Sequence, residues 1–209
     1  WIDRRHEMNR RFKHIQHYLP RTGHMLEVGS STGQFLVDMR ERGWTVTGVE
    51  ISAFAAEYAR ENLGLDIITG TLETADLPSN HFDLVTLWDV FEHVIDPQST
   101  LAEIRRVLKP GGYFIASIPN PTCIEARLFG DYWVGWDRPR HLHLFTPKVL
   151  ENYLHDAGME LEAIKSFSGR LGVTLMSVEF WAKARKIPQE KWGRWIKLAY
   201  SLPLRLITW

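Results

Sequence analysis

Two glycines near the start of the chain have the spacing of a nucleotide-binding turn, but not of a dinucleotide-binding one. Gly29 and Gly33 follow the apolar run at residues 24–28, and Ser31 stands where a dinucleotide fingerprint has its second glycine. That second glycine lets the backbone approach a pyrophosphate, so its replacement predicts a ligand without a diphosphate. The Lys-Ser/Thr pair of a phosphate-cradling loop is also absent.

Two carboxylates near this turn suit a ribose and a positively charged group. Glu50 ends the run WTVTGVE, 21 residues after Gly29, where a carboxylate can accept hydrogen bonds from both ribose hydroxyls. Glu27, directly before the glycine turn, suits a ligand with an amino group. An ordinary exposed residue at the end of a strand is the alternative for Glu50. S-adenosylmethionine is a ligand of this kind, because it bears a ribose, has no phosphate and is partly cationic.

The elements that must position these residues alternate between strand and helix. Helices are expected at residues 32–43, 53–64, 97–108 and 146–158, and again from Leu171 onward. Strands are expected at residues 24–28, 44–50, 65–69, 82–88, 113–119 and 159–168. The series predicts an α/β fold with a doubly wound, mostly parallel Rossmann-like sheet, helices on both faces and a helical C-terminal extension. Such sheets bind ligands at the carboxyl ends of their strands.

With these pieces in order, the chain resembles the class I S-adenosylmethionine-dependent methyltransferases. It is similar to the group of small-molecule methyltransferases that includes the ubiquinone-pathway O-methyltransferases. The resemblance rests on LEVGSSTG, VTGVEIS, GTLETADLPSNHFDLVTLWDVFEHVIDP and LAEIRRVLKPGGYFIASIPN, and covers about residues 20–165. The chain departs from the family at Ser30 and Ser31, where relatives commonly have Cys or Gly followed by Gly.

The resemblance implies cofactor-binding roles for eleven positions. The residues implied around the methionine part are Gly29, Ser30, Ser31 and Gly33, with Glu27 beneath them and Trp88 and Asp89 closing that side. Glu50 would hold the ribose. The residues implied at the adenine are Ile51, Thr71 and Leu72. Many relatives have an Asp at the place of Thr71, so a backbone amide or the Thr hydroxyl is expected to bind the adenine here.

Three histidines are candidates for acid/base catalysis or for orienting the acceptor. His93 directly follows the fourth strand, and His141 and His143 are two positions apart, which places them on one face of an extended segment. An oxygen acceptor benefits from a general base, and the loop context favours His141. A structural histidine is the alternative for each. No Cys/His cluster has zinc spacing, and we expect no metal.

An aromatic and charged stretch within about residues 120–146 is expected to form a lid over the acceptor. It contains Tyr132, Trp133, Trp136, Asp137, Arg138 and Arg140. Aromatic faces suit a sugar ring, a quinone or a lipid-linked group, and arginines suit a carboxylate or phosphate. A hydrophobic plug over the sheet edge is the alternative.

We therefore predict methyl transfer to a small-molecule, glycan or lipid-like acceptor, with oxygen favoured as the methylated atom. Two alternatives remain. The first is a catalytically silent module that binds the cofactor. The second is a nicotinamide-dependent oxidoreductase, which the glycine spacing disfavours.

Charge is unevenly distributed along a chain of zero net charge. Residues 25–169 carry eleven Lys/Arg against twenty-one Asp/Glu, whereas both ends are basic. The acidic middle argues against nucleic acid as a substrate. Residues 181–209 interleave aromatic and basic side chains, as interfacial helices do. Contact with a membrane surface or self-association is expected there, with simple domain packing as the alternative.

Three regions are expected along the chain. They are an N-terminal helical segment at 1–24, a methyltransferase domain at 25–168 and a helical basic and aromatic tail at 169–209. A single cysteine, Cys123, excludes an internal disulfide and indicates a cytoplasmic setting, with a peripheral membrane location as the alternative. The first residue, Trp1, and the apolar end indicate a segment of a longer protein.

Overall fold

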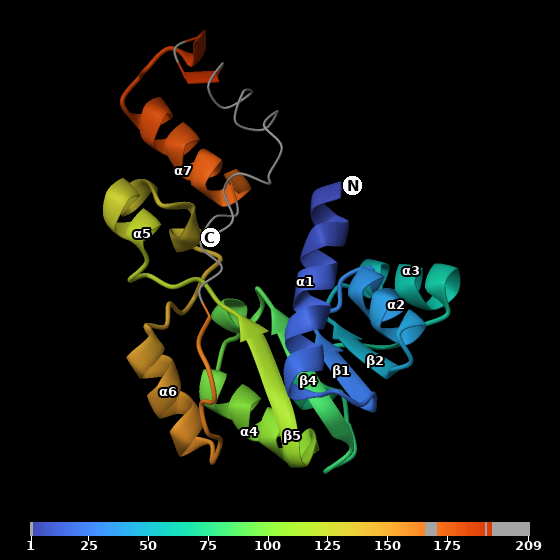
Figure 1. Ribbon diagram of the computed structural model, residues 1–209. Coiled ribbons are helices and arrows are strands. Elements are labelled where there is room, and N and C mark those ends of the chain that lie inside the picture. The colour runs from blue at the N-terminus through green and yellow to red at the C-terminus, as the bar shows by residue number, and fades with distance from the viewer. Residues whose placement is uncertain (1, 166–170, 191, 194–209) are drawn as a thin grey trace. The chain divides into compact units, whose positions relative to one another are not determined.

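The computed structural model describes residues 2–165, 171–190, 192 and 193 (Figure 1). The chain divides into two compact units, and each is described by itself. The sheet unit comprises residues 1–118 and 153–159, and the lid unit comprises residues 119–152 and 160–209.

The sheet unit is built on five parallel strands, which confirms the predicted doubly wound, Rossmann-like fold. The strands are β1 (His24–Val28), β2 (Thr45–Glu50), β3 (Asp66–Thr69), β4 (Phe82–Trp88) and β5 (Leu108–Ser117). Their order is β3-β2-β1-β4-β5. The winding direction therefore reverses between β1 and β4, and ligands of such sheets bind at the carboxyl ends of strands beside this point.

Helices precede or connect the strands in the order expected from the sequence. The α-helices are α1 (Ile2–Tyr18), α2 (Gln34–Glu41), α3 (Ala53–Leu63), α4 (Pro97–Val107), α5 (Ile124–Phe129), α6 (Pro147–Asp156) and α7 (Leu171–Ala184). The 3₁₀ turns are η1 (Leu72–Thr74), η2 (Phe91–His93), η3 (Gly130–Tyr132) and η4 (Val134–Trp136).

Local capping residues fix where the helices of the sheet unit begin and end. The hydroxyl of Ser52 accepts a hydrogen bond from the Ala55 amide at the start of α3, and Gly64 ends that helix in the left-handed conformation. Asp96 accepts hydrogen bonds from two amides at the start of α4, where Pro97 occupies the first turn.

The core between the helices and one face of the sheet is apolar and closely packed. Figure 1 shows α1, α2 and α3 grouped along the β1–β2 half of the sheet and α4 beside β5. Ile15 of α1, Leu36 and Met39 of α2, and Met25 and Leu84 of the sheet are all fully buried in one cluster. This packing holds α1 against β4 and against β1, the strand that ends at the glycine turn.

The last strand, β5, starts earlier than expected. It begins at Leu108 and includes the Lys-Pro-Gly-Gly sequence, which lies between the helix expected at 97–108 and the strand expected at 113–119. The register with β4 is irregular there, because Phe82 pairs with Leu108 and Leu84 pairs with Tyr113.

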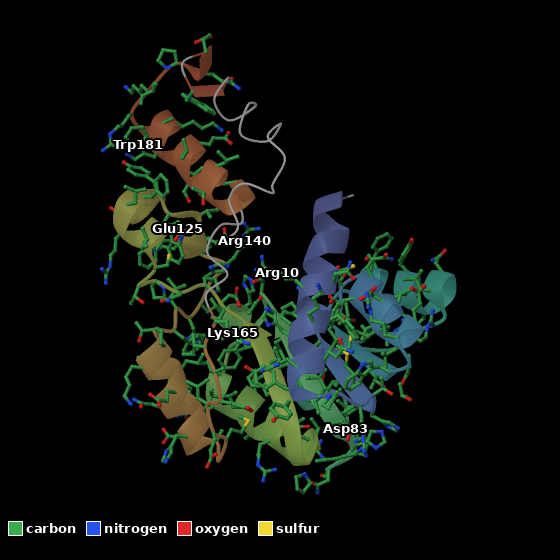
Figure 2. All side chains as sticks on the ribbon, viewed as in Figure 1. Arg10, Asp83, Glu125, Arg140, Lys165 and Trp181 are labelled. Atoms are coloured by element: carbon green, nitrogen blue, oxygen red, sulfur yellow. The ribbon has the colours of Figure 1, made fainter. Side chains whose placement is uncertain are left out.

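Asp83, labelled in Figure 2, accepts hydrogen bonds from the His24 amide and the Lys109 ammonium, both at 2.8 Å.

The prediction of a sixth strand at 159–168 is wrong over residues 159–165, which the structure places outside any strand. Residues 166–168 lie outside the described part of the chain. Ile164 is 51% exposed, so this apolar side chain of the alternating pattern is not packed against a sheet. A strand is stabilised by its cross-strand partners, and alternation alone does not supply one.

The described residues of the lid unit include α5, η3, η4, the first part of α6 and the longer helix α7. The stretch 120–146, where the sequence analysis expected a lid over the acceptor, contains α5, η3 and η4. Helix α7 contacts α5 and both 3₁₀ turns, and the Val134 amide donates a 3.0 Å hydrogen bond to the buried Ser177 hydroxyl of α7. Within the described residues, no helix is long and apolar enough to cross a membrane.

Candidate functional site

A cleft of about 430 Å³ lies in the sheet unit at the carboxyl end of β1. Its lining residues are Met8, Arg11, Glu27, Gly29, Ser30, Ser31, Thr32, Gln34, Phe35 and Trp88. They come from α1, β1, the glycine turn, α2 and β4. The volume is within the range of about 300–1,000 Å³ that is usual for small-molecule sites.

The glycine turn is held against β2 and leads directly into α2. The amides of Gly29 and Ser30 both donate to the carbonyl of Val49, at 2.8 and 3.2 Å. Gly29 has φ of 72°, and a Cβ at this position would overlap the Val90 side chain, so only glycine fits. Ser31 also adopts a left-handed conformation, with φ of 49°. The turn therefore brings backbone close to any ligand in the cleft.

Glu27 is a buried carboxyl group at the bottom of the cleft. The residue is 4% exposed, and burial raises the pKa of its carboxyl to about 8, with the nearby Arg11 opposing this rise and Glu50 adding to it. Its Oε2 and the hydroxyl of Ser30 are buried without a hydrogen-bond partner among the described residues. Buried polar atoms are nearly always paired, so these two atoms fit a polar ligand that donates hydrogen bonds.

Glu50 is held rigidly beside the turn and does not itself line the cleft. Its Oε2 accepts from the Ser31 amide at 2.7 Å, and its Oε1 accepts from the Ser52 amide at 2.8 Å. The residue is 8% exposed. A carboxylate has about four acceptor positions, so both oxygens can still accept a hydroxyl each. Such an orientation suits a pair of ribose hydroxyls.

Two residues of α1 line the cleft, although the sequence analysis assigned them no role. The guanidinium of Arg11 lies 4.5 Å from the ring centre of Trp88, and Trp88 packs edge-to-face against Phe35 at 5.5 Å. Met8 and Arg11 are three positions apart on the helix face that also buries Ile15. That helical spacing groups Met8, Arg11 and Ile15 on one face of the helix, but the sequence carries no signal that this face lies at the glycine turn.

The residues assigned to the adenine lie outside the cleft lining. Ile51 is 74% exposed, which leaves an apolar surface next to Glu50. Thr71 caps η1, and both its amide and its hydroxyl pair with the Thr74 hydroxyl, so an adenine would have to replace one of these contacts. Leu72 is buried in the core.

Asp89 points toward the end of β5. Its Oδ1 accepts a 2.7 Å hydrogen bond from the Ser117 hydroxyl, and its amide donates to the Ser117 carbonyl. The structure therefore gathers five of the eleven assigned residues in one cleft: Glu27, Gly29, Ser30, Ser31 and Trp88. Gly33 begins α2 beside this group.

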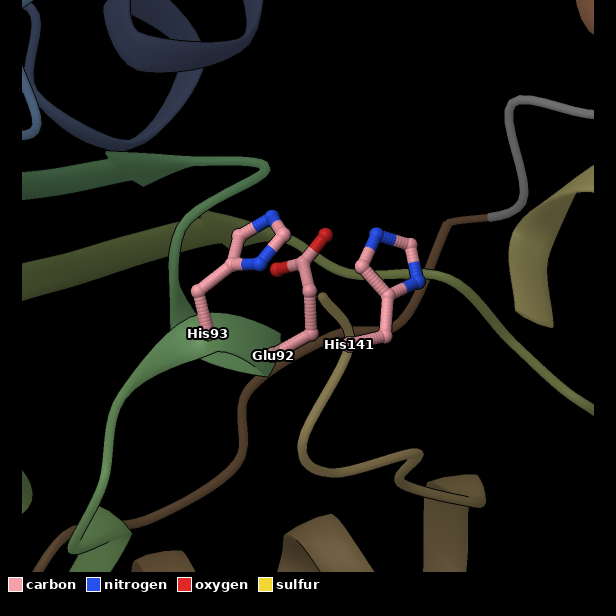
Figure 3. A group of neighbouring side chains, drawn as sticks. All are labelled: Glu92, His93 and His141. Atoms are coloured by element: carbon pink, nitrogen blue, oxygen red, sulfur yellow. The ribbon is translucent and has the colours of Figure 1, made fainter. Parts of the chain in front are cut away.

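The three candidate histidines lie in different surroundings. His93 is exposed on η2, directly after β4. His143 stacks on Phe145 with ring centres 5.8 Å apart, which is a packing role. His141 lies in the lid unit with its side chain 11% exposed. Figure 3 draws Glu92 and His93 on η2 and His141 on its loop.

His141 is oriented by its own loop. Its Nδ1 lies 2.7 Å from the Gly135 carbonyl, and because a carbonyl only accepts, Nδ1 carries a proton. The Nε2 atom lies 3.7 Å from a carboxylate oxygen of Asp137. A fixed Nδ1 proton leaves Nε2 as the atom that would exchange a proton in acid/base chemistry.

Glu92 is a second buried carboxyl group that the sequence analysis did not select. It is 1% exposed on η2, and burial raises the pKa of its carboxyl to about 7, with a smaller contribution from the charge of Asp89. A carboxyl group with this pKa can both accept and release a proton near neutral pH. Its position after a buried strand, next to His93, was the available signal.

Comparison with known proteins identifies relatives of the whole sheet unit. Residues 1–164 match a family model described as a methyltransferase domain. The chain is 30% identical over 185 residues to the ubiquinone biosynthesis O-methyltransferase of Stutzerimonas stutzeri, covering 78% of this chain and 79% of that protein. Identity to the enzyme of the same name from Saccharophagus degradans is 28% over 183 residues, with 78% and 77% covered.

Solved structures agree with this assignment. A Thermotoga maritima S-adenosylmethionine-dependent methyltransferase, described as a possible histamine N-methyltransferase, is similar with a TM-score of 0.57 and 29% identity, covering 70% of this chain and 68% of that one. Phosphoethanolamine N-methyltransferase 2 of Haemonchus contortus, solved with S-adenosyl-L-methionine, has a TM-score of 0.64 at 20% identity. It covers 92% of this chain and 46% of that one, and at this identity it supports the fold alone.

Proposed function

Because the chain belongs to the class I S-adenosylmethionine-dependent methyltransferases, we propose that it methylates an oxygen atom of a small-molecule acceptor. The observation that carries the choice of oxygen is the place of Glu92, a buried carboxyl group on η2, four residues after Trp88 of the cleft. Burial raises the pKa of this carboxyl to about 7, which suits a general base. Hydroxyl acceptors gain from such a base because a neutral hydroxyl is a weak nucleophile, whereas a neutral amine attacks through its own lone pair. The names of the two curated relatives also favour oxygen.

The residues of the cleft fit the methionine end of the cofactor. The unpaired Glu27 and Ser30 atoms would accept hydrogen bonds from the cofactor's ammonium group, and Arg11 would bind its carboxylate. When bound, the cofactor supplies an electrophilic methyl group on a sulfonium for an in-line displacement. Trp88 and Phe35 form the aromatic wall that would exclude water from this end of the cleft.

The adenosine end would lie over β2. Glu50 would accept hydrogen bonds from the ribose hydroxyls through oxygens that are already oriented by two backbone amides. The exposed side chain of Ile51 would pack against the adenine. These roles extend the family resemblance to positions of this chain and remain proposals.

Side chains of this protein would accept the proton that the acceptor hydroxyl loses. Glu92 would take the proton of the attacking hydroxyl, and the Nε2 atom of His141 is the second candidate for that role. Small-molecule acceptors with a phenolic, sugar or lipid-linked hydroxyl all remain within this proposal. Contact of residues 181–209 with a membrane surface and self-association also remain predictions, and most of that tail, including 194–209, lies outside the described residues.

A turnover experiment tests the proposal. The protein is incubated with S-adenosylmethionine and matched pairs of hydroxyl and amine acceptors, and formation of S-adenosylhomocysteine is measured. We expect turnover with hydroxyl acceptors only, and a Glu92→Gln variant that still binds the cofactor but turns over at least about a hundredfold more slowly. Products methylated on nitrogen would refute the choice of oxygen. Cofactor binding without any turnover would support the silent binding module instead.

A further inference from the structure

The lid unit contains a cavity of its own, of about 320 Å³. Its wall is formed by Asp131, Trp133, Val134, Trp136, Asp137, Arg138 and Phe180. All but Phe180 come from the stretch that contains η3 and η4, and Phe180 comes from α7. The volume lies at the lower end of the range of about 300–1,000 Å³ for ligand sites, which suits a single ring.

The aromatic part of this wall is fixed in place. Trp133 and Trp136 pack edge-to-face with ring centres 5.5 Å apart, and the Trp136 indole N–H donates a 2.8 Å hydrogen bond to the Gly130 carbonyl. A Cβ on Gly135 would overlap the Trp133 ring, so the turn depends on a glycine there. Phe180 is 44% exposed. The cavity therefore presents preformed aromatic surface.

The charged part of the wall is nearly balanced. Asp137 is paired with Arg140, labelled in Figure 2, at 2.6 Å. The guanidinium of Arg138 lies 5.1 Å from the ring centre of Trp136, and Asp131 supplies a carboxylate to the same wall. A cationic ligand would meet Arg138 and an anionic ligand would meet two carboxylates, so the lining favours a ligand without net charge.

A flat apolar ring is also disfavoured. It would cover charged groups without offering them hydrogen bonds, which costs free energy for each group left unpaired. A ring with apolar faces and hydroxyl groups around its edge satisfies both parts of the wall. Its face would stack on Trp136 or Phe180, and its hydroxyls would donate to Asp131 and accept from Arg138.

We propose that the lid cavity binds a neutral pyranose ring. This inference goes beyond the proposed function and makes no use of the cofactor cleft of the sheet unit. Binding of the sugar itself does not depend on methyl transfer. The two claims can therefore be tested separately.

The test is saturation-transfer NMR with a panel of methyl hexopyranosides and methyl deoxyhexopyranosides, applied to the full chain. Toluene and benzyltrimethylammonium are the flat apolar and cationic comparisons, and hydroquinone is the flat ring that also carries hydroxyls. We expect at least one pyranoside to bind in the millimolar range. An Asp131→Asn variant should bind it about tenfold more weakly because a hydrogen bond to a charged group is weakened. A Trp136→Ala variant should not bind the pyranoside measurably.

An exposed aspartate elsewhere provides the matched control. Asp156 has a side chain that is 68% exposed, so an Asp156→Asn variant should bind the pyranoside as the unmodified protein does. Cofactor binding, measured on every sample, establishes that the sheet unit of each variant is folded, and thermal unfolding compared with the unmodified protein checks the lid unit. The proposal is overturned if no pyranoside binds to protein that binds the cofactor, if Asp131→Asn binds unchanged, or if only toluene, hydroquinone or the ammonium compound binds. Turnover of sugar-free hydroxyl acceptors without pyranoside binding would overturn this inference and leave the proposed function standing.

Discussion

The protonation of Glu27 should control how tightly the protein binds its cofactor. Burial raises the pKa of this carboxyl to about 8, so below that pH the group is mostly neutral in the free protein. Binding of an ammonium group favours the ionised carboxylate. The cofactor must therefore displace a proton from Glu27 at neutral pH, and the apparent affinity must rise as the pH approaches 8.

The magnitude follows from the two titrating groups. The cofactor's amino group should titrate near an ordinary α-amino pKa of about 7.7–8.0. Multiplying the ionised fraction of Glu27 by the protonated fraction of that amine gives about 0.2 at pH 8, about 0.08 at pH 7 and about 0.01 at pH 6. Affinity should peak near pH 8 and fall about twentyfold by pH 6.

A Glu27→Gln variant separates this effect from other titrations. The amide can still accept a hydrogen bond but carries no charge, so affinity at pH 8 should fall about tenfold to a hundredfold. The decline of affinity toward pH 6 should disappear. Isothermal titration calorimetry in buffers of different ionisation enthalpy would also detect release of nearly one proton at pH 6 by the unmodified protein and none by the variant.

The same group affects stability in the absence of the cofactor. The raised pKa means that the folded protein retains a proton that the unfolded chain releases above about pH 4.5. The free energy of unfolding should therefore fall by about 4 kcal/mol between pH 4.5 and 8, and Glu27→Gln should lack this component. An affinity that does not change from pH 6 to 8, or a variant that keeps the full slope, would refute the reasoning.

Three further predictions concern other parts of the site. Glu50→Ala removes the acceptor of two backbone amides and should weaken cofactor binding at least about tenfold in calorimetry, whereas a mere surface role predicts no change. Gly29→Ala should lower the free energy of unfolding by at least about 2 kcal/mol in urea titrations, because the backbone strain at positive φ and the overlap with Val90 add. Gly64→Ala is the control, with φ of 59° but open space around it, and should lower the free energy of unfolding by only about 1 kcal/mol. Equal losses in the two variants would contradict this prediction. His141→Gln should lower kcat with cofactor affinity unchanged if Nε2 exchanges a proton, and an unchanged kcat would assign His141 to structure alone.

Much of the fold followed from the sequence because local patterns dictate it. The five strands were anticipated from apolar runs, and the helix expected at 53–64 agrees with α3, which Ser52 and Gly64 cap. Glycine spacing and the acidic strand end at Glu50 indicated a nucleoside ligand without a diphosphate. Each of these inferences depends only on residues close together in the chain.

Contacts between distant segments decided the rest. Arg11 enters the cleft because Ile15 of the same helix is buried against the sheet, and no local pattern states which helix will cover a turn. Glu27 and Glu92 acquire raised pKa values only through burial, which depends on the packed structure. The run at 159–165 alternates like a strand but has no partner, because strand pairing is a property of the assembled sheet and not of the segment.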